Sequence, residues 1–228
     1  MTTLIPITCL AALFSALSFA QTPQCAAVES APPLDQEVPH YELTNGSIVD
    51  GLAELSHNRS VQLHLGIEEI LRERLQSPLD RSVRFSVVLE HKSVRDILNA
   101  LCAYDARYTW STDGQTINVY PQARVSDSTD LLNFRIERIE LAEIPDPDQA
   151  LTPLSKLFPG EEIGYMQLGG EAAYDAPWTV TFENLTARQF MNRIAEHIGP
   201  RTIWRWQGGK DARVFGFARG GFETRQTQ

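Results

Sequence analysis

Short runs with two different hydrophobic periods alternate along the chain. Apolar residues fall at every second position over residues 61–67, which predicts a strand with one buried face. Over residues 94–101 they recur at helical spacing, which predicts a helix with one buried stripe, and Ser93 precedes it as an N-cap. Asp113 and Gly114 stand between two extended runs and predict a tight hairpin turn. The pattern therefore predicts a mixed fold of short strands and short helices.

Residues 39–120 carry the first complete set of these signals. They predict a strand, a helix, two strands, a second helix and a closing hairpin. An additional helix is expected at residues 68–78, where apolar positions again recur at helical spacing and Pro78 ends the run. The same order of elements returns after residue 131 without the additional helix. The polar stretch 121–130 between the two regions is interpreted as a linker.

The second region repeats the pattern of the first. Residues 88–104 and 181–197 align without a gap, and the inward positions of the two predicted helices match in type. We therefore expect an α+β fold of two βαββαβ-type lobes, residues 39–120 and 131–218, in which short helices pack on small mixed sheets. The matching pairs are Leu89 with Phe182, Glu90 with Glu183, Ser93 with Thr186, Arg95 with Arg188, Ile97 with Phe190, Leu98 with Met191, Asn99 with Asn192, Leu101 with Ile194, Arg107 with Arg201, and Trp110 with Trp204.

The N-terminal residues 1–20 have no charged side chain and are apolar over most of their length. This is typical of a secretory signal peptide, and the small residues near its end predict cleavage between Ala20 and Gln21. Residues 21–38 are rich in proline and lack apolar periodicity, so they are interpreted as a leader, and residues 219–228 as a polar tail. The mature chain is expected in the periplasm or outside the cell.

Acidic residues outnumber basic residues 29 to 20, and the formal net charge is -9. A protein that binds a phosphate backbone carries an excess of lysine and arginine, so this balance argues against a nucleic-acid partner. After the signal peptide, no apolar run reaches the length of about 20 residues that spans a membrane. The composition is that of an ordinary protein with a packed core.

Residues 38–120 resemble the short N-terminal domain of secretins and TonB-dependent receptors. In that family an extended run precedes a helix that has a Ser or Thr cap and an Arg-x-x-Leu-x-x-Leu pattern, and a hairpin that begins with tyrosine follows. The residues that stand at these places are Ser93, Arg95, Leu98, Leu101 and Tyr108. Residues 131–218 look like a diverged second copy.

The resemblance implies a periplasmic interaction module. Domains of this family stand at the front of outer-membrane secretins and signalling receptors, where they contact inner-membrane or regulatory proteins. No secretin ring domain follows in this sequence. We therefore expect the chain to act as a free module.

Two cysteines, Cys25 and Cys102, remain after removal of the signal peptide. In an oxidising compartment such a pair predicts a disulfide, which would tie the leader to the first lobe. The alternative is that Cys102, four residues after Leu98 on a predicted helix, is a small core residue. The sequence leaves both readings open.

Motifs for nucleophilic catalysis, phosphate binding and dithiol chemistry are not found in the sequence. His64 and Glu68 stand four residues apart, but His64 lies on a predicted strand and is expected to face solvent. Trp204 and Trp206 share one face of a predicted strand, where they either pack in the core or form a platform for a ligand. We therefore expect no catalytic, cofactor-binding or metal-binding residue.

The predicted function is that of an exported, non-catalytic module that binds an envelope protein, such as a secretin, a TonB-type receptor or a regulator. An open strand edge in the first lobe would take up an extended segment of the partner. Two alternatives stay open, namely a hydrolase of envelope polymers that uses paired carboxylates and a binder of a small ligand that uses tryptophans between the lobes. The residues expected on the partner-facing strands are Arg84, Ser86, Thr109, Ser111 and Asn118.

The signal peptide makes a direct prediction about the mature protein. We expect the intact mass of the exported chain to correspond to a start at Gln21, because the small residues at positions 18 and 20 fit the signal peptidase. Mass spectrometry of the periplasmic or secreted fraction measures it. A product that retains Met1 would contradict export by this route.

Overall fold

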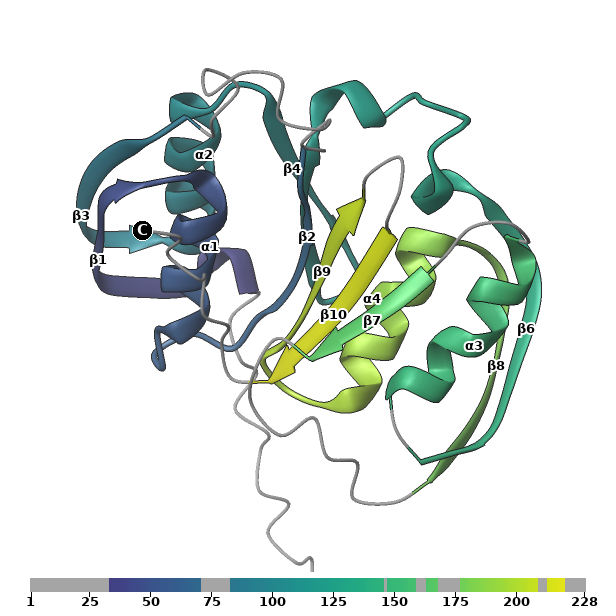
Figure 1. Cartoon of the computed structure of the whole chain (residues 1–228). Coiled ribbons are helices and arrows are strands. Elements are labelled where there is room, and N and C mark those ends of the chain that lie inside the picture. The colour runs from purple at the N-terminus through teal and green to yellow at the C-terminus, as the bar shows by residue number, and fades with distance from the viewer. Residues whose placement is uncertain are drawn as a thin grey trace, which may run out of the picture. The chain divides into compact units, whose positions relative to one another are not determined.

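The computed structural model describes residues 33–70, 83–145, 147–158, 163–167, 177–208 and 213–219. These residues belong to one compact unit and form the mixed α+β fold that the sequence predicts. Figure 1 shows their helices and strands. The predicted cleavage site, the additional helix beyond residue 70 and the polar tail beyond residue 219 lie outside the described residues.

The first repeat runs from a short 3-10 helix to a hairpin. Its second helix follows directly on the strand before it, because Ser93 ends that strand and caps the helix by accepting a hydrogen bond from Asp96 N–H at 3.1 Å. The elements are η1 (Pro33–Asp35), β1 (Glu37–Gly46), α1 (Ile48–His57), β2 (His64–Glu68), β3 (Phe85–Ser93), α2 (Val94–Tyr104), β4 (Tyr108–Asp113) and β5 (Thr116–Pro121).

The second repeat has the same elements in the same order. Thr186 caps its last helix by accepting a hydrogen bond from Gln189 N–H at 3.2 Å, and Gly199 ends that helix at a φ of 124°. The elements are η3 (Leu131–Asn133), β6 (Arg135–Ile144), α3 (Pro147–Leu157), β7 (Ile163–Gln167), β8 (Trp178–Thr186), α4 (Ala187–Ile198), β9 (Thr202–Gly208) and β10 (Arg213–Arg219). Each repeat is thus βαββαββ, because the closing hairpin contributes two strands.

The repeats match in backbone detail, not only in hydrophobic pattern. Asn45 and Glu143 have φ angles of 48° and 50° at corresponding places, and both lie where the strand pairing shifts by a bulge. His91 and Asn184 likewise have φ angles of 48° and 53°. Positive φ is uncommon outside glycine, so two matched pairs are strong support for duplication. The internal repeat predicted from the sequence is confirmed.

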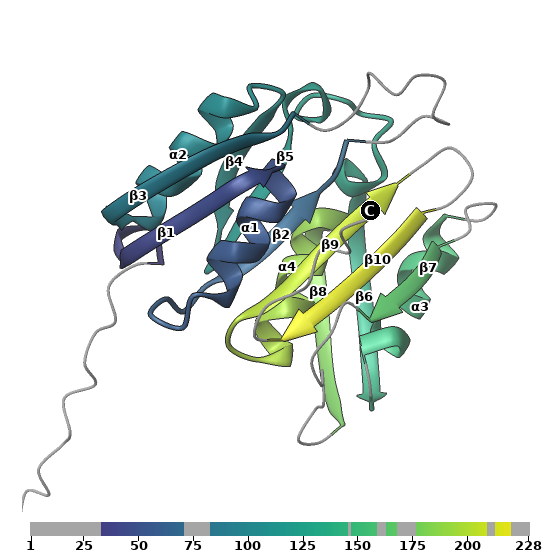
Figure 2. The same ribbon diagram turned by 60° about the vertical axis from the view of Figure 1, so that its left-hand side comes forward.

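The repeats share one sheet. Each repeat has a two-stranded antiparallel sheet of its own, β1–β3 and β6–β8, but the other strands join in a six-stranded sheet of order β4-β5-β2-β9-β10-β7. The joint is a parallel pairing of β2 with β9, in which Leu65 lies opposite Ile203 and Gly66 opposite Trp204. Figure 2 shows β2 beside β9, with β10 on the far side of β9. The two predicted lobes therefore pack as one unit.

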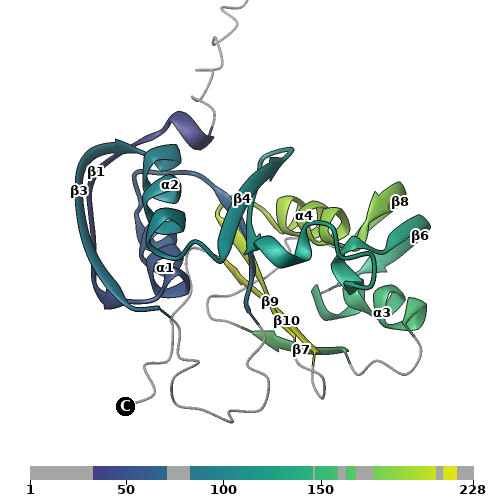
Figure 3. The same cartoon turned by 90° about the horizontal axis from the view of Figure 1, so that it is seen from above.

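The helices of the two repeats cover opposite faces of the shared sheet. The Trp110 indole N–H on β4 donates to Asn99 of α2 at 3.1 Å, whereas the Trp204 indole N–H on β9 donates to Asn192 of α4 at 2.7 Å. Figure 3 shows α1 and α2 on one side of the sheet and α4 on the other. β9 also runs opposite to its counterpart β4, since β4 is antiparallel to β5 while β5, β2 and β9 are parallel. A half-turn about a line across the strands, combined with a shift along that line, therefore relates the repeats.

The polar stretch 121–130, interpreted from the sequence as a linker, is hydrogen-bonded to the second repeat. It contains the 3-10 helix η2 (Gln122–Arg124). The Asn133 side-chain amide donates to the backbone carbonyls of Arg124 and Asp127, both at 2.8 Å, and Arg124 forms an ion pair with Asp130 at 3.3 Å. The proline-rich leader is also shorter than predicted, because β1 begins at Glu37.

The buried stripe of α2 makes the fold sensitive to a charge at Leu98, whose side chain is 0% exposed. We expect Leu98→Asp to lower the free energy of unfolding by several kcal/mol, because an unpaired carboxylate would lie in the apolar core. Ala103→Asp on the exposed face of the same helix is the control and should change it by about 1 kcal/mol or less. Urea titration followed by circular dichroism compares the two, and equal losses would contradict the assigned core face.

Candidate interaction site at the edge strand β4

The strand β4 lies at one end of the six-stranded sheet. It pairs with β5 on one side. Within the part of the chain that the structure describes, it pairs with no strand on its other side. A strand with one unpaired side offers backbone N–H and C=O groups to an incoming segment.

The phase of the β4–β5 ladder decides which backbone groups face outward. Gln122 N–H donates to the Arg107 carbonyl at 2.8 Å, and Tyr108 lies opposite Pro121. In an antiparallel ladder this makes Tyr108 and Pro121 a non-hydrogen-bonded pair. The arrangement suits proline, which has no backbone N–H to donate.

Backbone groups of β4 then alternate between β5 and the open side. Those of Thr109 and Ser111 point toward β5, and those of Trp110 and Thr112 point away from it. Thr109, Ser111 and Trp110 are half-buried, and Thr112 is exposed. The outward groups of Trp110 and Thr112 therefore form the part of the edge that an added strand would bind.

The counterpart of β4 in the second repeat has the same edge occupied. β9 pairs with β10 as β4 pairs with β5, and on its other side it receives β2 in parallel. Trp204 of β9 corresponds to Trp110, and Gly66 of β2 lies opposite it. The edge that is unpaired in one repeat is thus a strand-binding edge in the other.

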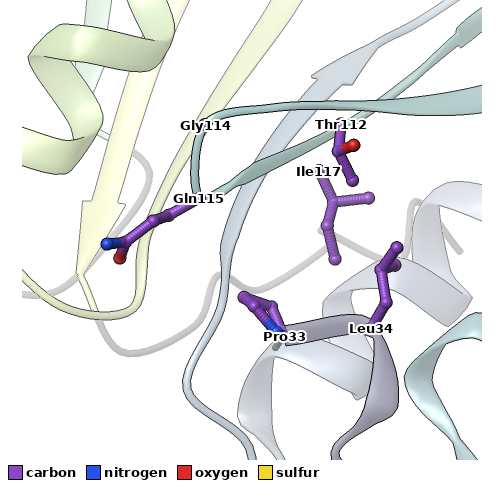
Figure 4. Close-up of a pocket in the computed structure, with 6 residues that line it drawn as sticks. All are labelled: Pro33, Leu34, Thr112, Gly114, Gln115 and Ile117. Atoms are coloured by element: carbon purple, nitrogen blue, oxygen red, sulfur yellow. The ribbon is translucent and has the colours of Figure 1, made fainter. Parts of the chain in front are cut away.

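A small pocket adjoins the open edge (Figure 4). Its volume is about 150 Å³, and it lies between η1 and the end of the β4–β5 hairpin. In the second repeat, Trp206 and Phe215 occupy the places of Thr112 and Ile117, with ring centroids 4.3 Å apart in the core. The smaller side chains of Thr112 and Ile117 thus line the pocket at the positions where the second repeat has two aromatic rings. Its lining residues are Pro33, Leu34, Thr112, Gly114, Gln115 and Ile117.

A buried charge cluster holds β2 against the second repeat. Glu68 at the end of β2 is 0% exposed and forms a two-point ion pair with Arg188 of α4, which also donates to Asn133 at 2.6 Å. Arg124 lies 4.0 Å from the Glu68 carboxylate. Burial raises the pKa of Glu68 above its ordinary value, and Arg188 opposes this rise. The cluster favours the observed register of the β2–β9 pairing, because the buried Glu68 carboxylate meets the Arg188 guanidinium there.

Adjacent Glu69 extends the same joint. Its carboxylate accepts hydrogen bonds from Arg205 and from Gln207 of β9, the latter at 2.9 Å. Sequence reasoning missed these charge partners, because Glu69 and Arg205 are far apart along the chain. The sequence did contain a sign of buried charge partners: two adjacent carboxylates, Glu68 at the end of β2 and Glu69 directly after it, follow a run of buried residues.

His64 does not face solvent as the sequence predicts, because the second repeat covers that face of β2. Its side chain is 8% exposed, and burial lowers the pKa of the imidazole below its ordinary value. Among the described residues, no group of three or more His, Cys, Asp or Glu side chains has the geometry to hold a metal ion.

The five residues predicted to face a partner separate into three places. Thr109 and Ser111 lie on the edge strand β4. Asn118 lies on β5, which pairs on both sides, and is 1% exposed, so the structure does not place it on an open edge. Ser86 lies on β3 and Arg84 directly precedes that strand; the Arg84 guanidinium donates to the Asn45 carbonyl at 2.7 Å, and the Ser86 hydroxyl accepts from Asn45 N–H at 2.8 Å.

The remaining sequence predictions concern tryptophan and cysteine. Trp204 and Trp206 are buried in the core of the second repeat, which confirms the core-packing reading for both rings. Cys102 is half-buried, and burial raises the pKa of its thiol to about 11. Cys25 lies outside the described residues, so the Cys25–Cys102 disulfide stays a prediction. None of the described helices is long and apolar enough to cross a membrane.

The buried cluster predicts a large cost for loss of Arg188. We expect Arg188→Met to lower the free energy of unfolding by about 3 kcal/mol, because Glu68 would keep its burial but lose its main partner. Arg138→Met is the control, since Arg138 pairs with Glu183 on the surface, where the two side chains are 61% and 55% exposed, and its loss should cost at most about 1 kcal/mol. Chemical denaturation of both variants measures this, and equal effects would show that the cluster does not hold the repeats together.

Comparisons with protein-family models, with curated proteins and with solved structures give no match for this chain.

Proposed function

We propose that this chain is an exported, non-catalytic interaction module that binds an extended segment of another protein by adding it as a strand to β4. The observation that carries the proposal is the occupied edge of β9. It shows that this strand type, in this fold, receives a parallel strand along the side that β4 leaves unpaired among the described residues. Backbone hydrogen bonds to Trp110 and Thr112 would supply the affinity.

The pocket beside Thr112 adds a means of selecting the partner. In strand addition, backbone contacts bind any extended segment, and pockets for alternate side chains distinguish one sequence from another. The pocket volume of about 150 Å³ is the size of an apolar cavity that takes up benzene. One apolar side chain of the incoming segment would therefore fit.

The proposed partner is a protein of the cell envelope, such as a secretin, a TonB-type receptor or a regulator. The predicted signal peptide favours a location in the periplasm or outside the cell, and the resemblance of residues 38–120 to the secretin and TonB short N-terminal domain favours this class of partner. The net charge of -9 disfavours nucleic acid. No cofactor is part of this proposal.

Thr112→Pro tests the edge directly. Proline removes the outward N–H of Thr112 but spares the ladder to β5, so the variant should fold and lose its partner. Thr112→Ala is the matched control, because it removes the same hydroxyl and keeps the N–H. Wild type and each variant are used to capture partners from envelope extract, and mass spectrometry identifies the captured proteins. Circular dichroism of all three proteins checks that they are folded.

We expect wild type and Thr112→Ala to capture the same proteins, and Thr112→Pro to lose them. Capture of the same set by a folded Thr112→Pro variant would contradict binding at β4. Failure of wild type to capture any protein, together with turnover of an envelope polymer, would support the hydrolase alternative instead.

A further inference from the structure

We infer that the β4 edge selects a segment with glycine opposite Trp110, and that Trp110 is the residue that sets this specificity. The inference rests on the proposed function, since it concerns the sequence of the strand that β4 binds. It comes from the joint between the repeats, where the chain contains its own example of such a strand.

Glycine is required at the joint because a tryptophan ring lies across the neighbouring strand. Gly66 of β2 lies opposite Trp204 of β9. A Cβ atom added to Gly66 would lie 2.5 Å from the side-chain oxygen of Asn118 on β5. It would also lie 2.4 Å from Cζ2 of Trp204 and 2.5 Å from Cε2 of the same ring. Both contacts are far inside van der Waals distance, and the ring is buried and fixed by its bond to Asn192. No larger residue fits there without displacing the ring.

Trp110 is held in the same way as Trp204. Its indole N–H donates to Asn99 on α2, as that of Trp204 donates to Asn192 on α4, and the two asparagines correspond in the repeat. Trp110 lies opposite Val119 of β5, as Trp204 lies opposite Phe217 of β10. Two rings with the same anchor and the same strand position present the same side to a strand on the open edge. Trp110 is only half-buried, which leaves ring surface for that strand to cover.

The joint also sets the direction and register of the incoming segment. It runs parallel to β4, as β2 runs parallel to β9. With glycine opposite Trp110, the residues before and after it lie opposite Thr109 and Ser111 and point to the other face of the sheet. The second residue after glycine lies opposite Thr112, beside the pocket. The selected pattern is therefore glycine followed two positions later by a side chain that reaches the pocket.

The same rule excludes a second copy of this chain as the occupant. β7 ends the sheet at the opposite side and is the counterpart of β2. In the two ladders Gly66 lies opposite Asn118 and Met166 lies opposite Gly216, so Met166 stands where β2 has glycine. Glycine is therefore absent from the position of β7 that would lie opposite Trp110 of a neighbouring copy. The partner is thus a different protein, and the methionine disfavours chain-to-chain extension of the sheet.

The test uses the full chain and a peptide with the sequence VQLHLGILEI, which is residues 61–70 with E68L, so that an apolar side chain lies two positions after the glycine. Its twin carries G66A, which adds one Cβ atom. A control peptide carries L65A, at a position that faces away from the ring. We expect G66A to bind about tenfold or more weakly than the parent peptide, and L65A to bind nearly as well, as measured by fluorescence anisotropy with labelled peptides.

The protein variant Trp110→Ala supplies the converse test, in which the ring is removed from the protein and the peptides stay the same. Without the ring, the parent and G66A peptides should bind with the same affinity, because the space for the added Cβ is open. If Trp110→Ala does not fold, a third peptide that carries G66V is tested on the wild-type protein instead. The affinity should then fall from the parent peptide to G66A to G66V, as the side chain at this position grows.

The outcomes separate the inference from the proposed function. Equal binding of the parent and G66A peptides, both lost in Thr112→Pro, would overturn the glycine rule and leave binding at β4 intact. Equal binding of the parent peptide by wild type and Thr112→Pro would overturn both. If wild type binds no peptide, the joint is not a guide to the ligand and the inference is wrong, while the capture experiment decides the proposed function by itself.

Discussion

The parallel pairing of β2 with β9 is the contact on which the rest of the structure depends. It converts two small repeats into one six-stranded sheet with a core on each face. Glu68 and Glu69 at the end of β2 bind Arg188 and Arg205 of the second repeat. An unpaired buried charge is costly, so the cluster penalises any shift of β2 along β9 and holds one register. Gly66 permits that register because it leaves room for Trp204.

The two repeats join head to tail, so that two different kinds of strand edge meet at the joint. A half-turn combined with a shift along the sheet brings an edge of the β2 type to an edge of the β4 type, so that among the described strands one edge of each type has no neighbour at the two ends of the sheet. The unused edges have diverged from the pair that meets. Met166 stands in place of Gly66, and Ser111 in place of Arg205. At both positions, the strands at the ends of the sheet therefore differ in sequence from the strands that form the internal joint.

Local structure was accessible from sequence to a large extent. Ser93 and Thr186 cap their helices as predicted, Gly199 ends α4, and the alignment of Asn99 with Asn192 and of Trp110 with Trp204 corresponds to two equivalent hydrogen bonds. These features depend on residues within a few positions of one another or within one repeat. Asn118 and His64 were misplaced, because their burial is produced by strands and helices that only the joint brings near them.

The sequence by itself determined the α+β class, the duplication and the buried face of each helix, since hydrophobic period and capping are local properties of a chain. It placed Thr109 and Ser111 on a hairpin strand but did not determine which strand of the sheet has an unpaired side. Only the tertiary structure decided that, by pairing β2 with β9 and thereby leaving β4 at the end of the sheet. The neighbour of β2 depends on contacts between residues more than a hundred positions apart, such as Glu68 with Arg188. The period of apolar residues along the chain gives no information about such distant contacts.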